Sequence, residues 1–320
     1  MTWPQAAIVL LGVLHALAAY AYFSSKRFAL PWALGWLAIA ATAAWALPRA
    51  PGWAATAFAV AVLGWTAWWV SLRALPRRHW VAENARQATG SVSAGTAMLR
   101  DVRDFHWRSS KEFDERWDSD VRVELDALEA VDLFVCTWGD PRIAHLIVSF
   151  VVRGAPAIAF SIETRREVDE SWSAFAGFMK AFELIIIAAR ERDVVHVRTN
   201  VRRETVHRYR LATTPAMRAR LLQQYVHEMN ALARRPRYYN TLFANCTTEV
   251  ARIVRASGRR LPWAWPLVAS GLVPRYFHRR GLIDDARPFE AIVAEADIGE
   301  RARAETAGDD GSGYSDRIRS

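Results

Sequence analysis

Three long apolar stretches, separated by short polar segments, occupy the first 72 residues of the chain. They cover Trp3–Phe23, Phe28–Leu47 and Trp53–Leu72, and each approaches the ~20 residues that a helix needs to cross a bilayer. Amphipathic indole rings favour the membrane interface, and the tryptophans near the ends of these stretches are Trp3, Trp32, Trp45, Trp53, Trp68 and Trp69. The pattern predicts three transmembrane helices within a membrane anchor at residues 1–73.

After the anchor, the apolar runs become shorter and charged residues occur throughout. We expect a linker at 74–100, an α+β domain with a mostly antiparallel sheet and flanking helices at 101–290, and a disordered polar tail at 291–320. Strands are expected at Val131–Trp138, Ala144–Val152, Ala157–Thr164, Val194–Val197 and Thr205–Leu211. Helical periodicity marks Val121–Ala130 (or an amphipathic connector), Ser173–Ile187 (whose end could be a strand), Thr214–Arg235 and Asn245–Ser257.

The charge distribution agrees with this division. No Asp or Glu precedes Glu83, and the net charge of +9 suits an anionic membrane surface at least as well as nucleic acid. No zinc-finger spacing or arginine-rich block is present, so nucleic acid is not an expected partner. The positive-inside rule would place Lys26, Arg27 and the basic cluster at 73–78 in the cytoplasm, together with the globular domain.

The chain has two cysteines, which excludes a disulfide scaffold and a four-cysteine metal site. Cys246 follows Asn245, a good N-cap residue, so it falls in the first turn of an expected helix. There the helix dipole and free N–H groups favour a thiolate, lower its pKa and can stabilise an oxyanion. A small buried hydrophobe is the alternative, and Cys136, inside an apolar strand, fits it well. No HExxH, clustered His/Asp spacing, Walker loop or GxGxxG occurs, so no metal or cofactor is expected.

A nucleophilic thiol also needs a base. His145 opens a strand directly after a turn, where it can project from a rigid sheet as a general base. Glu163 lies on the strand expected to pair with it and could orient the imidazole. A structural histidine and an ion pair of Glu163 with Arg165 or Arg166 are the alternatives, and His196 is a weaker candidate base.

Six separated motifs stand in the globular part: DVRDFHWRSSKEFDERW from Asp101, IAHLIVSF, FSIETRRE, FELIIIAARERDVVHVRTN, PRYYNTLFANCTT and SGLVPRYFHRRGLID. Together they resemble the Lnb N-terminal periplasmic domain family over about Trp80 to Asp285. The resemblance implies a circularly permuted relative of NlpC-type, papain-like enzymes, in which a strand histidine precedes the helix cysteine. It implies Cys246 as nucleophile and His145 as base, with Glu163 and Asn245 in supporting positions.

The same resemblance implies acyl transfer in a bacterial envelope. Cys246 would take an acyl chain from a phospholipid as a thioester, and a lipoprotein or other amine would accept it. The expected location is the bacterial inner membrane with a periplasmic domain, because long domains translocate largely regardless of charge. A cysteine hydrolase, either a cell-wall peptidase or amidase or a lipid deacylase, stays open. So does a non-catalytic envelope scaffold, which a raised thiol pKa or separated Cys and His side chains would favour.

Overall fold

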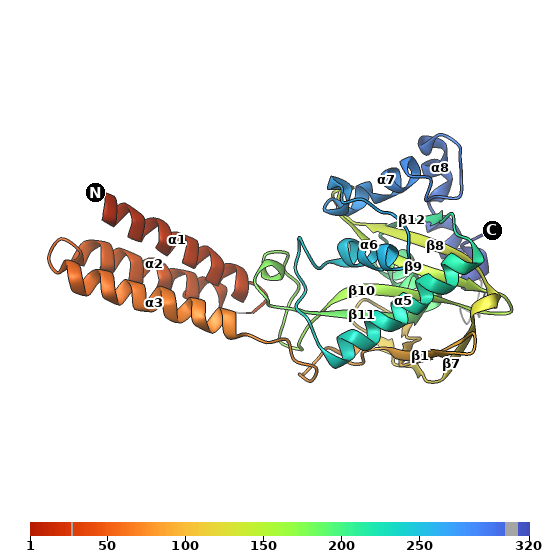
Figure 1. The fold of residues 1–320 in the computed structure, drawn as a ribbon, viewed down its shortest axis with the longest axis horizontal. Coiled ribbons are helices and arrows are strands. Elements are labelled where there is room, and N and C mark those ends of the chain that lie inside the picture. Colours follow the sequence, from red (N-terminus) through yellow and green to blue (C-terminus); the bar gives the residue numbers. More distant parts are fainter. Residues whose placement is uncertain (27, 305–312) are drawn as a thin grey trace. The chain divides into compact units, whose positions relative to one another are not determined.

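The chain folds into two units, each assembled from segments that lie far apart in the sequence. A computed structural model describes residues 1–26, 28–304 and 313–320 (Figure 1). Unit 1 comprises Met1–Ala85, Thr164–Leu184 and Pro236–Ala244. Unit 2 comprises Arg86–Glu163, Ile185–Arg235 and Asn245–Ser320, and it holds all four predicted site residues.

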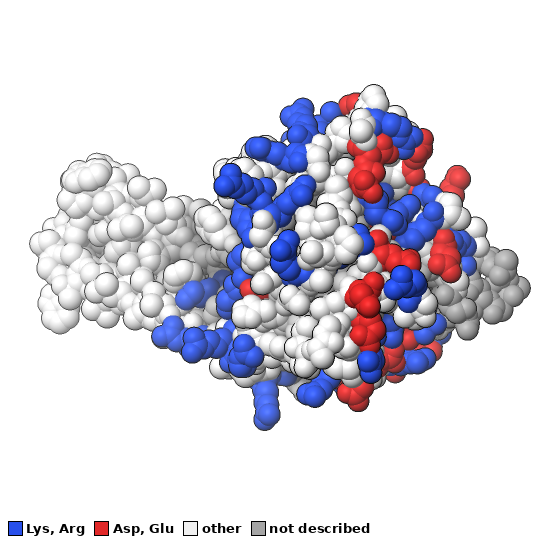
Figure 2. All heavy atoms as spheres, turned by 45° about the vertical axis from the view of Figure 1, so that its right-hand side comes forward, with Lys and Arg blue, Asp and Glu red and all other residues white. Residues whose placement is uncertain are grey.

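Unit 1 begins with the three predicted membrane helices. They are α1 (Trp3–Phe23), α2 (Ala29–Ala46) and α3 (Pro51–Ser71), and each is long and apolar enough to cross a membrane. Small residues let α1 and α2 approach closely, since a Cβ added at Gly12 would lie 2.1 Å from the Cβ of Ala40. Figure 2 shows no charged side chain on the visible face of this part of the molecule. The three predicted helices are confirmed in number and approximate bounds.

The other two segments of unit 1 pair with each other. The N–H of Tyr239 donates to the carbonyl of Phe182 (2.9 Å), and that of Leu184 donates to the carbonyl of Arg237 (2.8 Å). The long helix expected at Ser173–Ile187 is wrong: only the single turn η3 (Ala176–Phe178) is helical there. A strand follows it, as the isoleucine run allowed, because β-branched residues favour extended backbone.

A seven-stranded sheet forms the centre of unit 2. Its strands, in spatial order, are β12 (Thr205–Arg210), β8 (Leu128–Thr137), β9 (Ala144–Val152), β10 (Ala155–Arg165), β11 (Glu183–Arg190), β3 (Val102–Arg103) and β6 (Trp117–Asp118). The β12–β8, β8–β9, β9–β10 and β3–β6 pairs are antiparallel, whereas β11 and β3 are parallel. The expected hairpin of β9 and β10 is confirmed, and it turns at Gly154, whose φ is +68°.

A second, three-stranded sheet lies where a linker and a helix were expected. It consists of β1 (Thr89–Ser93), β2 (Thr96–Arg100) and β7 (Val121–Glu124). The helix interpretation of Val121–Ala130 is therefore wrong, and residues 89–100 are a hairpin rather than a linker. The alternation of buried and more exposed side chains explains the hairpin, because Ala97 and Leu99 are both buried on one face of β2. A short ribbon of β4 (His106–Trp107) and β5 (Phe113–Asp114) completes this part.

Helices cover both faces of the large sheet. On one face α5 (Pro215–Arg234) places Tyr225 against Phe150 and Phe160, with ring centroids 6.0 and 4.5 Å away (Figure 1). Beside it lies α6 (Cys246–Ala256), joined to α5 by the ion pair of Arg252 and Glu228. Both of these helices were expected.

The opposite face packs against short C-terminal helices. Ile147 and Val195 belong to a buried cluster there with Tyr314 and Ile318. The strand expected at Val194–Val197 is wrong: this run lies in α4 (Glu191–Val194) and the π-helical turn η4 (Val197–Val201), since a short apolar run does not by itself distinguish strand from helix. The elements that follow are α7 (Val273–Arg279), α8 (Phe289–Ala296), α9 (Gly299–Arg303) and α10 (Tyr314–Arg317). Part of the tail expected to be disordered, residues 305–312, lies outside the described residues.

Candidate active site

Cys246 is the first residue of α6, and Asn245 caps this helix. The side-chain oxygen of Asn245 accepts hydrogen bonds from the backbone N–H groups of Thr247 and Thr248, both at 2.9 Å. The hydroxyl of Thr248 accepts in turn from the N–H of Asn245 at 2.9 Å, which completes a capping box. Asn245 therefore fixes the helix start that carries the thiol. These two N–H groups are occupied by the cap, so they are not the oxyanion donors that we expected.

The thiol of Cys246 lies against the backbone of β9. Its Sγ is 3.9 Å from the carbonyl oxygen of Ala144 and 3.8 Å from the hydroxyl of Thr247. Burial raises the pKa of the Cys246 thiol, and hydrogen bonds from the backbone of Leu146 and from Thr247 only partly oppose this. The expected lowering of the thiol pKa is therefore wrong, because burial outweighs the helix start. The raised pKa keeps this thiol in its neutral form.

His145 is the second residue of β9, and its imidazole begins a chain of hydrogen bonds. Its Nε2 lies 2.7 Å from the hydroxyl of Ser161, which donates to a carboxylate oxygen of Glu163 at 2.8 Å. Because the serine proton points to the carboxylate, the hydroxyl accepts from Nε2–H, and this network assigns the lone pair to Nδ1. Burial and the nearby Arg198 lower the pKa of His145 to about 3, against the opposing effect of Glu163. The imidazole is neutral and can act as a base through Nδ1.

Glu163 is held by an arginine that sequence reasoning did not single out. Arg198, from η4, donates to Glu163 at 3.3 Å and to Glu204 at 3.2 Å. Burial raises the pKa of Glu163, but His145 and Arg198 together bring it below its ordinary value, so the group is a carboxylate. The alternative was an ion pair of Glu163 with Arg165 or Arg166, but the Arg165 guanidinium donates to the carbonyl oxygens of residues 84 and 85, and Arg166 donates to Glu83. Glu163 thus lies 3.5 Å from Nε2 of His145 and is linked to it through Ser161.

The structure brings the thiol to the backbone of Ala144 and Leu146, on either side of His145, rather than to the His145 ring. Among the described residues, no hydrogen bond joins Cys246 Sγ to the imidazole. Side chains alternate along a strand, so His145 shares a face with Ile147, whereas α6 lies beside α5 on the other face. The paired register of β9 with β10 ends at Ile147 and Ser161, and His145 lies beyond that end.

Residues 113–271 match the family model of the Lnb N-terminal periplasmic domain. This segment belongs to that domain family. No curated protein and no solved structure matches the chain, and the permuted papain-like arrangement stays a prediction. A periplasmic domain family together with three apolar N-terminal helices fits an inner-membrane protein with a periplasmic domain. The matched residues include the cysteine, the histidine and both supporting positions.

Two polar residues of the Lnb domain were missed by sequence reasoning. Ser161 stands two residues before Glu163 on β10, so strand alternation alone places both side chains on one face. Arg198 had no local signal, because it reaches Glu163 from an irregular helical turn 35 residues later in the chain. The other cysteine, Cys136, is fully buried in β8, as expected of a structural residue.

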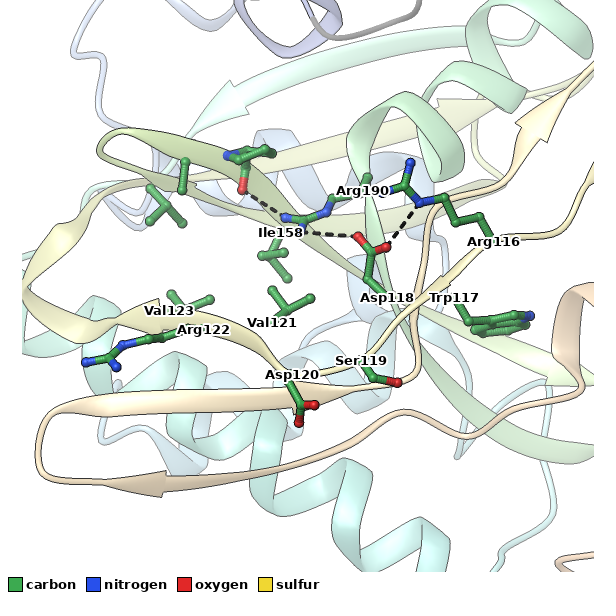
Figure 3. Close-up of a pocket in the computed structure, with 13 residues that line it drawn as sticks. Arg116, Trp117, Asp118, Ser119, Asp120, Val121, Arg122, Val123, Ile158 and Arg190 are labelled. Carbon is green, nitrogen blue, oxygen red and sulfur yellow. Dashed lines mark hydrogen bonds and ion pairs between the residues drawn. The ribbon is translucent and has the colours of Figure 1, made fainter.

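A separate cavity of about 470 Å³ lies at the other end of β9 in the Lnb domain. Figure 3 shows Asp118 between Arg116 and Arg190, at 3.2 and 3.5 Å respectively. The cavity is lined at Val152, about 23 Å along the strand from His145 at ~3.3 Å per residue. It is distinct from the cysteine and histidine.

The raised pKa of Cys246 predicts the pH dependence of its alkylation. In full-length Cys136→Ala protein in detergent, the rate of reaction with iodoacetamide should still be rising above about pH 8.5, the ordinary pKa of cysteine. Only the thiolate reacts, and burial shifts its formation to higher pH. Mass spectrometry of the labelled protein measures this rate, with Cys246→Ser as the blank. A rate that already levels off below pH 7 would contradict the neutral resting thiol.

Proposed function

We propose that this protein is a membrane-anchored thiol acyltransferase that moves an acyl chain from a phospholipid, through a thioester on Cys246, to a lipoprotein amine. One observation carries the proposal: a capped helix start seats the thiol of Cys246 against the strand backbone that flanks His145. The membership in the Lnb N-terminal domain family and the three membrane helices support an envelope setting.

The chemistry takes two balanced steps. In the first, Nδ1 of His145 takes the thiol proton while Sγ attacks the ester carbonyl, the ester C–O bond breaks, and the proton passes to the departing lysophospholipid alcohol. In the second, the amine nitrogen attacks the thioester, the C–S bond breaks, and an amine proton returns the thiol to its neutral form. Each step needs a neutral imidazole at its start, which is the state that burial favours.

The hydrogen-bond chain supports the charged imidazole that each step creates. Once Nδ1 accepts a proton, Nε2–H still donates to Ser161, and Ser161 donates to the carboxylate of Glu163. A carboxylate 3.5 Å from Nε2 stabilises the imidazolium, since opposite charges attract strongly away from water. Arg198 lowers the pKa of His145 and so opposes its protonation, but it also lowers the pKa of Glu163 and keeps that group ionised.

A thioester adduct tests the proposal directly. Full-length protein incubated with phospholipid vesicles is expected to gain one acyl group in its intact mass, removable by hydroxylamine, with release of lysophospholipid. Cys246→Ser should show no hydroxylamine-sensitive adduct, whereas Cys136→Ser, the matched control at the buried cysteine, should behave as wild type. Failure to detect either the adduct or lysophospholipid would overturn the phospholipid-donor scheme.

A non-catalytic envelope scaffold is the second candidate, and two observations favour it. Burial raises the pKa of the Cys246 thiol, and its sulfur does not hydrogen-bond to His145 among the described residues. The scaffold predicts that neither cysteine variant changes any lipid reaction. A hydrolase predicts an adduct that decays in water at the same rate with or without an amine acceptor, whereas the transferase predicts faster decay with the amine.

A further inference from the structure

Unit 1 exposes a group of large apolar side chains outside its membrane helices. Trp172, Phe175 and Phe178 are 58, 64 and 40 % exposed, although such rings are normally buried in a folded protein. Leu242 and Phe243, in the second segment of the unit, are 39 and 79 % exposed. Contiguous exposed apolar residues mark a surface that binds something apolar.

Hydrogen bonds fix the first of these segments to the ends of two membrane helices. The N–H of Ser171 donates to the carbonyl of Ser25 (2.8 Å), just beyond the end of α1. The indole N–H of Trp69, in the last turn of α3, donates to the carbonyl of Met179 (3.2 Å). The ammonium group of Lys180 donates to the carbonyl of Trp69 (3.2 Å) and lies 4.5 Å from the centre of its ring. Residues 171–180 therefore lie level with the helix ends.

The second segment is fixed to the first. The N–H of Thr241 donates to the carbonyl of Gly177 (3.2 Å), and its hydroxyl donates to the carbonyl of Ala174 (3.1 Å). The contact is tight, because a Cβ added at Gly177 would lie 2.4 Å from the hydroxyl oxygen of Thr241. We call residues 171–180 and 241–243 together the aromatic platform.

We propose that the aromatic platform inserts into the membrane interface and binds phospholipid at the level of the headgroups and upper acyl chains. Helix ends at the boundary of the hydrocarbon bring the segments bonded to them to this depth. Tryptophan and phenylalanine rings are stable there, and the cation Lys180 suits lipid phosphates. The same end of the bundle carries an aromatic cluster of Phe23, Trp32, Trp65 and Trp68, as expected at an interface.

The platform has a consequence that rests on the proposed function. Phe243 is followed, three residues later in the chain, by Cys246. A platform immersed among phospholipids would therefore anchor the segment that leads into the nucleophile. This favours a membrane lipid, rather than a soluble peptide, as the substrate that reaches the thiol.

Spin-label depth measurements test the platform without any assay of activity. Single cysteines at Phe175→Cys and Phe178→Cys, in the full chain with Cys136→Ala and Cys246→Ala, are labelled and reconstituted into anionic phospholipid vesicles. Leu63→Cys, exposed within α3, marks the hydrocarbon, and Arg153→Cys, in the β9–β10 turn, marks the aqueous phase. The ratio of oxygen to nickel-chelate accessibility should place both platform labels between the two markers. Platform labels that match Arg153→Cys would overturn the inference and indicate a soluble partner surface.

The unmodified protein supplies a second measurement that does not depend on the cysteine-free background. A phospholipid with a photoreactive diazirine near its headgroup should crosslink to peptides that contain residues 172–178 or 242–243. Crosslinks confined to the membrane helices would overturn the proposal. Neither measurement requires acyl transfer. The platform can therefore be established even if the thioester is never observed, and the thioester can be observed even if the platform does not bind lipid.

Discussion

Replacement of His145 by alanine is expected to lower kcat/KM for acyl transfer by about 10²–10⁴-fold, the usual contribution of a general base. The variant keeps Cys246 and its capped helix but removes the atom that accepts the thiol proton. This matters more than in an enzyme with a preformed thiolate, because burial raises the pKa of this thiol. Initial rates of lysophospholipid release, measured over a range of lipid concentrations in mixed micelles, give the value.

His196→Ala is the matched control for this prediction. His196 belongs to the same domain, and its ring packs 5.6 Å from that of Tyr314. Its replacement should leave kcat/KM within a few fold of wild type. The assignment of His145 would be wrong if its alanine variant retained most of the activity while Cys246→Ser retained none.

Glu163→Gln should show an intermediate loss with a distinctive pH profile. Glu163 raises the pKa of His145, so its neutralisation lowers that pKa further and makes the imidazole a weaker base. The acid limb of kcat/KM is therefore expected to stay below pH 5 in both proteins, while the plateau falls in the variant. If Glu163 only supported the fold, its replacement would lower the unfolding temperature. The plateau of kcat/KM would then not fall independently of the acid limb.

The parts of the fold that local pattern determines were predicted correctly. Three apolar runs became the membrane helices, and alternating or continuous apolar runs bounded by turns became β8, β9 and β10. Errors arose where a short apolar run fits either element, as at Val194–Val197, or where alternation was mistaken for a helical period, as at Val121–Ala130. Contacts with residues that lie far away in the sequence decide which element forms in such cases.

The site divides in the same way. Asn245 and Cys246 could be recognised together because a capped helix start is a local feature. The direction in which the thiol pKa shifts could not be recognised from the sequence, because it depends on how deeply β9 and α6 bury the sulfur. Arg198 and its contact with Glu163 depend on an irregular turn that no local rule describes.

The C-terminal tail shows how composition can mislead. Its polar residues favoured disorder, yet the described residues bury Tyr314 and Ile318 completely. Arg319 donates to Asp132 at 3.0 Å and to Glu191 at 2.7 Å, and both acids are inaccessible to solvent. Both buried carboxylates thus bond to an arginine from the tail, a pairing that distance in the sequence conceals.

Asp193→Ala is expected to destabilise the domain by about 3–5 kcal/mol, because it removes the carboxylate from a buried, hydrogen-bonded ion pair. Asp193 is fully buried and accepts two hydrogen bonds from Arg103, at 2.8 and 2.9 Å. It also accepts from the backbone N–H of Phe105 (3.0 Å) and the indole N–H of Trp107 (2.7 Å). One carboxylate thus ties Arg103, Phe105 and Trp107 of the first sequence motif to α4.

The measurement is the thermal unfolding midpoint of the full chain in detergent, where a loss of this size corresponds to a fall on the order of 10 °C for a domain of this length. Asp140→Ala is the matched control: Asp140 also forms a two-pronged ion pair, with Arg142 at 2.6 Å, but in an exposed turn. Exposed ion pairs contribute little, so this variant should melt close to wild type. Equal midpoints for the two variants would show that the Asp193 network is not what secures the motif, and that the burial of Phe105 and Trp107 alone is sufficient.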